Sequence, residues 1–116
     1  MGESYLSGVE FKDSGQKEGV LLAALQHLVG KPLRLVLKTD EITTLADCFV
    51  TPKAVVRRED RIEAGHLTLD HVYFDLVNDQ QVKLYFPLVQ FQAVTDYGDS
   101  RLFQFDTYAW TATIRA

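Results

Sequence analysis

Two histidines, His66 and His71, lie close in sequence to Asp70 and Asp75 and are the residues best suited to acid–base or metal chemistry. Imidazole and carboxylate groups transfer protons and can together bind a divalent cation. In a regular strand, residues five positions apart face opposite sides, so His66 and His71 would share a metal only across a bulge. We therefore expect no metal site and no cofactor. An enzyme working through His66, His71 and Asp70 remains an alternative.

Cys48 is the only cysteine, which excludes an intramolecular disulfide and a thiolate-rich zinc site. A catalytic thiolate needs a lowered pKa, whereas the carboxylate of the preceding Asp47 raises a thiol pKa. We interpret Cys48 as a small buried hydrophobic residue, and a single cysteine favours a reducing compartment, the cytoplasm. The chain has no Gly-x-Ser-x-Gly elbow and no phosphate-binding glycine loop. We predict no catalytic residues; a small hydrolase or metal-dependent enzyme is the less favoured alternative.

The 116-residue chain has a formal net charge of -4, which disfavours phosphate-rich partners. Its only basic cluster, interrupted by two acidic residues, comprises Lys53, Arg57, Arg58 and Arg61. These four residues are the candidate nucleic-acid patch, and a ring of copies could concentrate them on one face. No apolar segment reaches the roughly 18 residues of a membrane helix, and we expect no secretory signal and no membrane partner.

One apolar segment, VLLAALQHLV, has the spacing of an amphipathic helix and predicts a helix over Val20–Val29. Ser14 is a candidate N-cap, while two glycines before Val20 disfavour an earlier start. Gly30 suits the left-handed position after a helix, and Pro32 prevents continuation. Residues 1–15 are expected to form a loose arm with one short strand.

The remainder, residues 33–114, has the pattern of short strands separated by turns. The predicted strands are 33–38, 42–50, 54–56, 66–77, 81–94 with a bulge, edge or break at Pro87, and 101–114 as one strand or a bent pair. The charged run 57–61 is interpreted as a loop or strand end. A single domain that is mostly β (α+β) is predicted, with its N-terminal helix packed on a strongly bent antiparallel sheet or a small barrel.

Order and spacing over residues 20–94 resemble the Sm-like family. The similar features are the helix, the Gly30-Lys31 opening of the first strand, and two late short strands divided at Pro87. The resemblance implies an Sm-like or SH3-like barrel whose edge strands pair with those of neighbouring copies to close a ring. The family binds RNA through an Asp and an Asn before its third strand and an Arg-Gly pair between its last two. This chain has Lys53 and Arg57 in the first stretch and no Arg-Gly pair, so no RNA-binding residue is carried over.

Ten of the thirteen aromatic residues fall between Tyr73 and Trp110, where most are expected in the core. In the predicted strand 66–77, alternation places His71, Tyr73 and Asp75 on one face. The main functional prediction is a non-catalytic interaction or assembly module that forms a homo-oligomer through strand edges. The alternative is a domain that binds a small molecule or peptide in a pocket between helix and sheet. That pocket would be lined by Tyr73, Tyr85, Tyr108 and Trp110.

Overall fold

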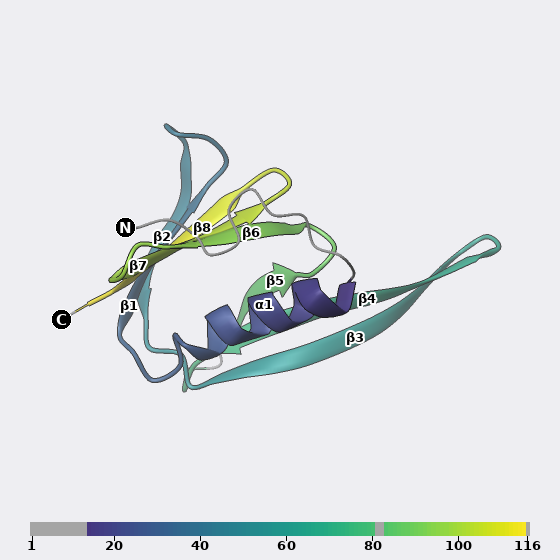
Figure 1. Ribbon diagram of the computed structural model, residues 1–116, viewed down its shortest axis with the longest axis horizontal. Coiled ribbons are helices and arrows are strands. Elements are labelled where there is room, and N and C mark those ends of the chain that lie inside the picture. The colour runs from purple at the N-terminus through teal and green to yellow at the C-terminus, as the bar shows by residue number, and fades with distance from the viewer. Residues whose placement is uncertain (1–13, 81–82, 116) are drawn as a thin grey trace.

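The computed structural model describes residues 14–80 and 83–115, in which one helix precedes eight strands (Figure 1). The elements are α1 (Ser14–Gln26), β1 (Leu33–Lys38), β2 (Thr44–Val50), β3 (Ala54–Ala64), β4 (Leu67–Val77), β5 (Lys83–Pro87), β6 (Phe91–Asp96), β7 (Ser100–Phe105) and β8 (Ala109–Ile114). The mostly β fold class with an N-terminal helix is confirmed. The arm and short strand expected before residue 14 lie outside the described residues.

The strands form two antiparallel sheets. One has five strands in the order β2-β1-β8-β7-β6, and the other has three in the order β3-β4-β5. Strand β1 lies between β2 and β8, so the first and last of the described strands are neighbours. The described strands do not close into a barrel. Of the two predicted architectures, an antiparallel sheet and a small barrel, the structure therefore has open antiparallel sheets. The β1–β2 and β3–β4 hairpins project from the body in different directions (Figure 1).

The core lies where α1 and the two sheets meet. Helix α1 contributes Leu21 and Leu25, and the turn after it contributes Leu28, all with no exposed surface. Phe86 of β5 is also fully buried, and its ring lies 5.8 Å from that of Phe103 and 6.1 Å from that of Trp110, between ring centroids. Phe86 therefore joins the three-stranded sheet to the five-stranded one.

Helix α1 begins and ends earlier than the apolar segment predicts. It starts at Ser14 rather than Val20, because tertiary contacts hold its glycine-containing first turns. Lys17 donates to the carbonyl of Val89 in the turn between β5 and β6, and Glu18 pairs with Arg57 of β3. After Gln26 the chain continues in tight turns and reaches Gly30, which has the expected positive φ of 82°.

The charged run 57–61 lies in the middle of strand β3, so its interpretation as a loop or strand end was wrong. Each residue of the run faces a residue of β4, from Arg57 opposite Phe74 to Arg61 opposite Asp70. A polar strand that is paired with complementary charges can extend beyond the core as one half of a hairpin.

The late strands follow two of the predicted alternatives. The predicted strand 81–94 breaks at Pro87, which ends β5 before a turn, and residues 101–114 form the pair β7–β8 rather than one strand.

The β1–β2 turn is held by the carboxylate of Asp40. Its Oδ1 accepts hydrogen bonds from the backbone N–H groups of Thr43 at 2.6 Å and Ile42 at 2.7 Å, and its Oδ2 accepts one from the Thr43 hydroxyl. The Thr43 backbone bond, followed by that of Ile42, lowers the pKa of Asp40 below its ordinary value of 3.8.

We expect Asp40→Ala to destabilise the protein at pH 7 and to reduce the loss of stability on acidification. A carboxyl group whose pKa is lowered by folding stabilises the fold above its unfolded pKa, and this contribution disappears as the pH falls through the folded pKa. Urea unfolding at pH 7, 4 and 2 measures this. Glu41→Ala is the control, since Glu41 makes none of the three Asp40 bonds; equal pH profiles for the two variants would contradict the prediction.

Candidate functional site

The structure separates the four aromatic residues that were expected to line one pocket. Trp110 is 7% exposed and packs in the core against Phe86. Tyr108 stacks on Phe105, with ring centroids 4.9 Å apart. Tyr73 and Tyr85 lie on the face of the three-stranded sheet that points away from α1, because the adjacent Phe74 and Phe86 fill the inner face.

Neither of two surface hollows, of about 510 and 520 Å³, is lined by any of these four residues. These two hollows give the expected pocket no support, and it stays a prediction. Alternation along a strand predicts which residues share a face, but it does not say which face is covered.

Tyr73 and Tyr85 form a cluster with His71, which we call the outer-face cluster. The ring centroids of Tyr73 and Tyr85 are 5.0 Å apart, and those of His71 and Tyr73 are 5.3 Å apart. The Nε2 atom of His71 lies 2.5 Å from the hydroxyl oxygen of Tyr85. The face shared by His71, Tyr73 and Asp75 is therefore as alternation predicted, and β5 adds Tyr85 to it.

Two carboxylates flank the outer-face cluster. Asp60 lies opposite His71 in the β3–β4 pairing, and Asp75 is 7% exposed, with Arg58 Nε 3.4 Å from its Oδ2. Burial is the largest cause that raises the pKa of both tyrosines; the charges of Asp60 and Asp75 raise them further. The phenols therefore stay protonated, and the cluster is better suited to binding than to nucleophilic chemistry.

The candidate nucleic-acid residues do not form one basic patch. Arg57 and Arg61 point toward the α1 side of the hairpin, Arg58 points to the opposite side, and Lys53 precedes β3. Each pairs with a carboxylate: Lys53 with Asp79, Arg57 with Glu18 and Glu59, Arg58 with Asp75, and Arg61 with Asp70. Nucleic-acid binding by these residues stays a prediction, and their neutralisation weakens its basis.

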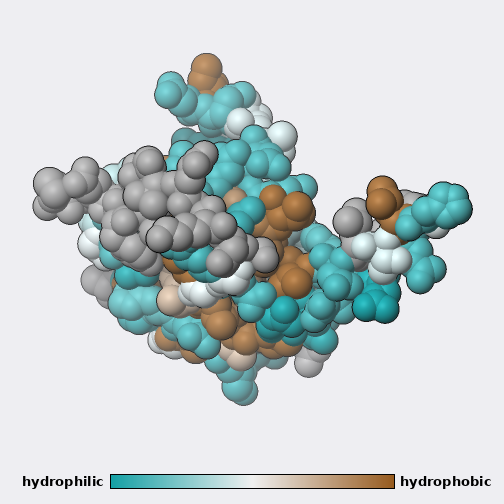
Figure 2. All heavy atoms as spheres, turned by 45° about the vertical axis from the view of Figure 1, so that its right-hand side comes forward, coloured by the Kyte–Doolittle hydropathy of each residue, from teal (hydrophilic) through white to brown (hydrophobic). Residues whose placement is uncertain are grey.

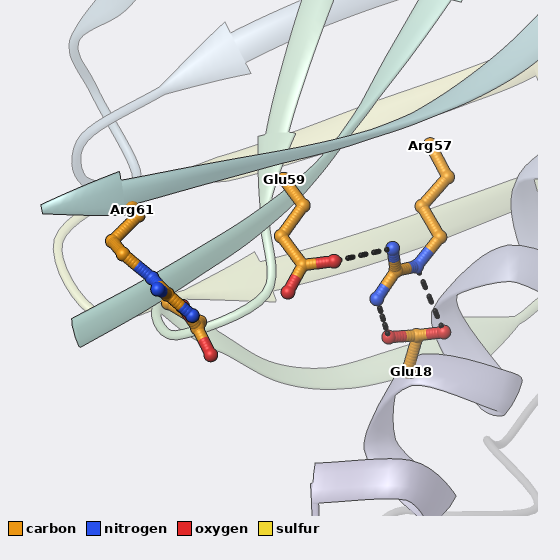
Figure 3. Close-up of polar contacts among 5 residues, drawn as sticks. Glu18, Arg57, Glu59 and Arg61 are labelled. Carbon is orange, nitrogen blue, oxygen red and sulfur yellow. Dashed lines mark hydrogen bonds and ion pairs between the residues drawn. The ribbon is translucent and has the colours of Figure 1, made fainter. Parts of the chain in front are cut away.

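Arg57 links the helix to the hairpin (Figure 3). Its Nε and Nη2 atoms each lie 3.2 Å from an oxygen of Glu18, and its Nη1 lies 3.1 Å from Glu59. The three side chains border the 520 Å³ hollow, whose apolar lining residues are Val72, Leu88 and Val89. Because the arginine is held by two carboxylates, we interpret this group as a structural contact between α1 and β3.

The remaining candidates for chemistry are dispersed. His66 lies exposed in the turn between β3 and β4, whereas His71 lies in β4. Cys48 packs against the core, and burial, followed by Asp47, raises the pKa of its thiol. Among the described residues, no three His, Cys, Asp or Glu side chains are grouped to hold a metal ion.

The outer strand of the five-stranded sheet, β2, was not singled out from the sequence. Among the described strands it pairs with β1 alone, and its Phe49 is 64% exposed, with the guanidinium of Arg115 4.3 Å above the ring. Leu45 and Ile42 are exposed on the same hairpin. Figure 2 shows apolar surface at the tip of this hairpin, the upper projection, and at the tip of β3–β4.

The opposite edge of the same sheet, β6, is better covered. Phe91, Val94 and Thr95 of β6 are buried, and α1 packs against this strand. A bulge interrupts its pairing with β7 near Gln92, whose side chain bonds Asp106. Of the two edges, β2 is therefore the one that offers apolar surface to another strand.

Comparison of the chain with protein-family models, curated proteins and solved structures finds no match. In the described part of the chain, no helix has the length and apolar character needed to cross a membrane.

Proposed function

We propose that this protein is a non-catalytic assembly module in which the β2 edges of two copies pair. The observation that carries the proposal is an edge strand with a large exposed aromatic side chain at Phe49. An unpaired edge leaves peptide N–H and C=O groups without strand partners, and a second copy is the simplest source of partners. The Sm-like family, whose resemblance to this chain stays a prediction, also assembles through strand edges.

The direction of the peptide groups in β2 follows from the pairing of β1. The N–H of Arg115, just after β8, donates to the carbonyl of Pro32, just before β1. Because peptide groups alternate in direction along a strand, the even-numbered residues of β1 direct their N–H and C=O groups to β8, and the odd-numbered residues direct theirs to β2. Leu35 pairs with Cys48, so the peptide groups of Cys48 point to β1. Those of Asp47 and Phe49 consequently point to the free edge.

We infer an antiparallel pair with its two-fold axis at Cys48. Cys48 is the centre of residues 46–50, the part of β2 that pairs regularly with β1. At the start of β2, near Leu45, a bulge disturbs this pairing. In this register Phe49 lies opposite Asp47 of the second copy, and the two Phe49 rings are diagonal neighbours. A register centred on Asp47 would place like charges opposite each other, which is destabilising.

The ion pairs of the monomer are compatible with this register. Arg34 binds Asp47 through two hydrogen bonds, of 3.0 and 2.6 Å, so the charge of the carboxylate that meets Phe49 of the second copy is offset in part by an exposed ion pair. The two Cys48 side chains would lie opposite each other at a non-hydrogen-bonded position, where the strands are closest.

The cytoplasm is the proposed location of the protein, because its single cysteine favours a reducing compartment.

The proposal is tested by solution mass and by oxidation of Cys48. We expect light scattering to give twice the protomer mass of 13.2 kDa, with little dependence on salt. Diamide at pH 8.5, chosen because the thiol pKa is raised, is expected to give a covalent dimer that Cys48→Ser abolishes. In the Cys48→Ser background, Tyr97→Cys, an exposed turn position, is the control and should not crosslink. A monomer would overturn the proposal, and a dimer that crosslinks no better than the control would overturn the register.

A further inference from the structure

The outer-face cluster is a surface that β2 pairing leaves open. It belongs to the three-stranded sheet, and its exposed member Tyr85 is 45% accessible. The rings are tilted: the planes of Tyr73 and Tyr85 make an angle of 58°, so both an edge and a face are presented to a ligand. Aromatic surface of this kind on a sheet is a binding platform for a planar or cationic group.

The charged residues around these rings determine which kind of ligand group can bind to them. Asp60 is exposed beside Tyr73, and Asp75 lies buried in the same row of side chains as Tyr85. One guanidinium, that of Arg58, faces these two carboxylates, and its 3.4 Å contact with Asp75 is longer than a typical hydrogen bond. Lys83 lies on the same face but at the other end of it, one row beyond Tyr85, whose hydroxyl points toward His71. With Asp75 paired to Arg58, Asp60 opposite His71 supplies the uncompensated negative charge beside the rings.

A nucleic acid fits this surface poorly. Bases can stack on exposed rings, but the phosphates that accompany them would approach Asp60 and Asp75, and Arg58 is already paired. A guanidinium fits better, because its flat face stacks on an aromatic ring while its edge donates to carboxylates.

We propose that the outer face of β3–β4–β5 binds an arginine side chain of a partner polypeptide. The guanidinium stacks on Tyr85 and donates to Asp60, whereas Asp75 stays paired with Arg58. Tyr73 is held in place by its stacking on His71 and its ring contact with Tyr85. The site is separate from the β2 edge and does not require assembly.

The test uses the blocked tripeptide acetyl-Gly-Arg-Gly-amide, followed by NMR of the full chain. The peptide in which citrulline replaces arginine is the control, because it has nearly the same shape without the charge. We expect arginine to shift the resonances of His71, Tyr73 and Tyr85, and citrulline to bind at least about fivefold more weakly. Equal responses to the two peptides, or shifts confined to other regions, would overturn the proposal.

Matched variants distinguish binding at this site from nonspecific attraction of the cationic peptide to an acidic protein. Tyr85→Ala and Asp60→Asn are each expected to weaken arginine binding by about fivefold. Tyr97→Ala and Asp99→Asn, at an exposed turn between β6 and β7, should leave it unchanged. Equal weakening by both sets would show nonspecific attraction and refute the site. An oligouridylate that shifts the cluster when the peptide does not would likewise refute it, in favour of nucleic acid.

Discussion

Replacing Phe86 with alanine is expected to lower the free energy of unfolding by about 3 to 5 kcal/mol, the usual range for a buried phenylalanine. Phe86 is fully buried, and its ring lies within 6.1 Å of Phe103, Phe105 and Trp110 between centroids. These neighbours come from the other sheet, so the cavity would open at the junction of the two sheets. Because small domains are stable by only about 5–15 kcal/mol, this is a large share of the total.

Urea unfolding followed by circular dichroism measures the effect. Tyr85→Ala is the matched control, since Tyr85 is adjacent but faces outward, and we expect it to cost about 1 kcal/mol. If Phe86→Ala does not fold, Phe86→Leu keeps most of the volume and should retain a cooperative transition at reduced stability. A loss for Phe86→Ala no greater than that for Tyr85→Ala would show that the sheets do not pack as described.

Replacing Phe49 with aspartate is expected to weaken assembly by at least about a hundredfold. In the proposed register the new carboxylate meets Asp47 of the second copy, and the two-fold axis repeats this repulsion. The monomer should tolerate the change, because Phe49 is mostly exposed and Arg115, now above its ring, can pair with the aspartate. Sedimentation equilibrium over a dilution series measures the dissociation constant.

The opposite charge at the same position tests the register itself. Phe49→Lys loses the same ring but places an ammonium group opposite Asp47, so it should weaken assembly less than Phe49→Asp. Leu67→Asp is the control at the tip of the β3–β4 hairpin, where the leucine is 66% exposed, and it should leave assembly unchanged. Equal effects of aspartate and lysine at position 49 would contradict the proposed pairing of Phe49 with Asp47.

Local pattern predicted most elements but not how far they extend. Apolar spacing located the helix near Val20, yet its first turns depend on Glu18 meeting Arg57, a contact between segments 39 residues apart. The charged run 57–61 has no apolar alternation, and its strand conformation depends on β4 alongside it. Such tertiary partners override local propensity, and one segment alone cannot reveal them.

The candidate sites were predictable to different degrees. Alternation placed His71, Tyr73 and Asp75 together, which is the basis of the outer-face cluster. It did not reveal that Trp110 packs against Phe86 on the inner side of the three-stranded sheet, whereas Tyr73 lies on the outer side of that sheet. The open edge at β2 was not predictable from its own residues, because it depends on β8 occupying the other side of β1.

The position of β8 between β1 and β7 also sets the order in which the fold can form. The three-stranded sheet uses consecutive strands and can form while the chain is still being synthesised, at about 5–20 residues per second. Strand β1 is made early but lacks its β8 partner until the end of the described chain has been synthesised. Until then the β1–β2 hairpin has two open sides, and β7 has one. The interval between synthesis of β1 and of β8 is therefore when a nascent chain is most exposed to mispairing, and fast elongation shortens it.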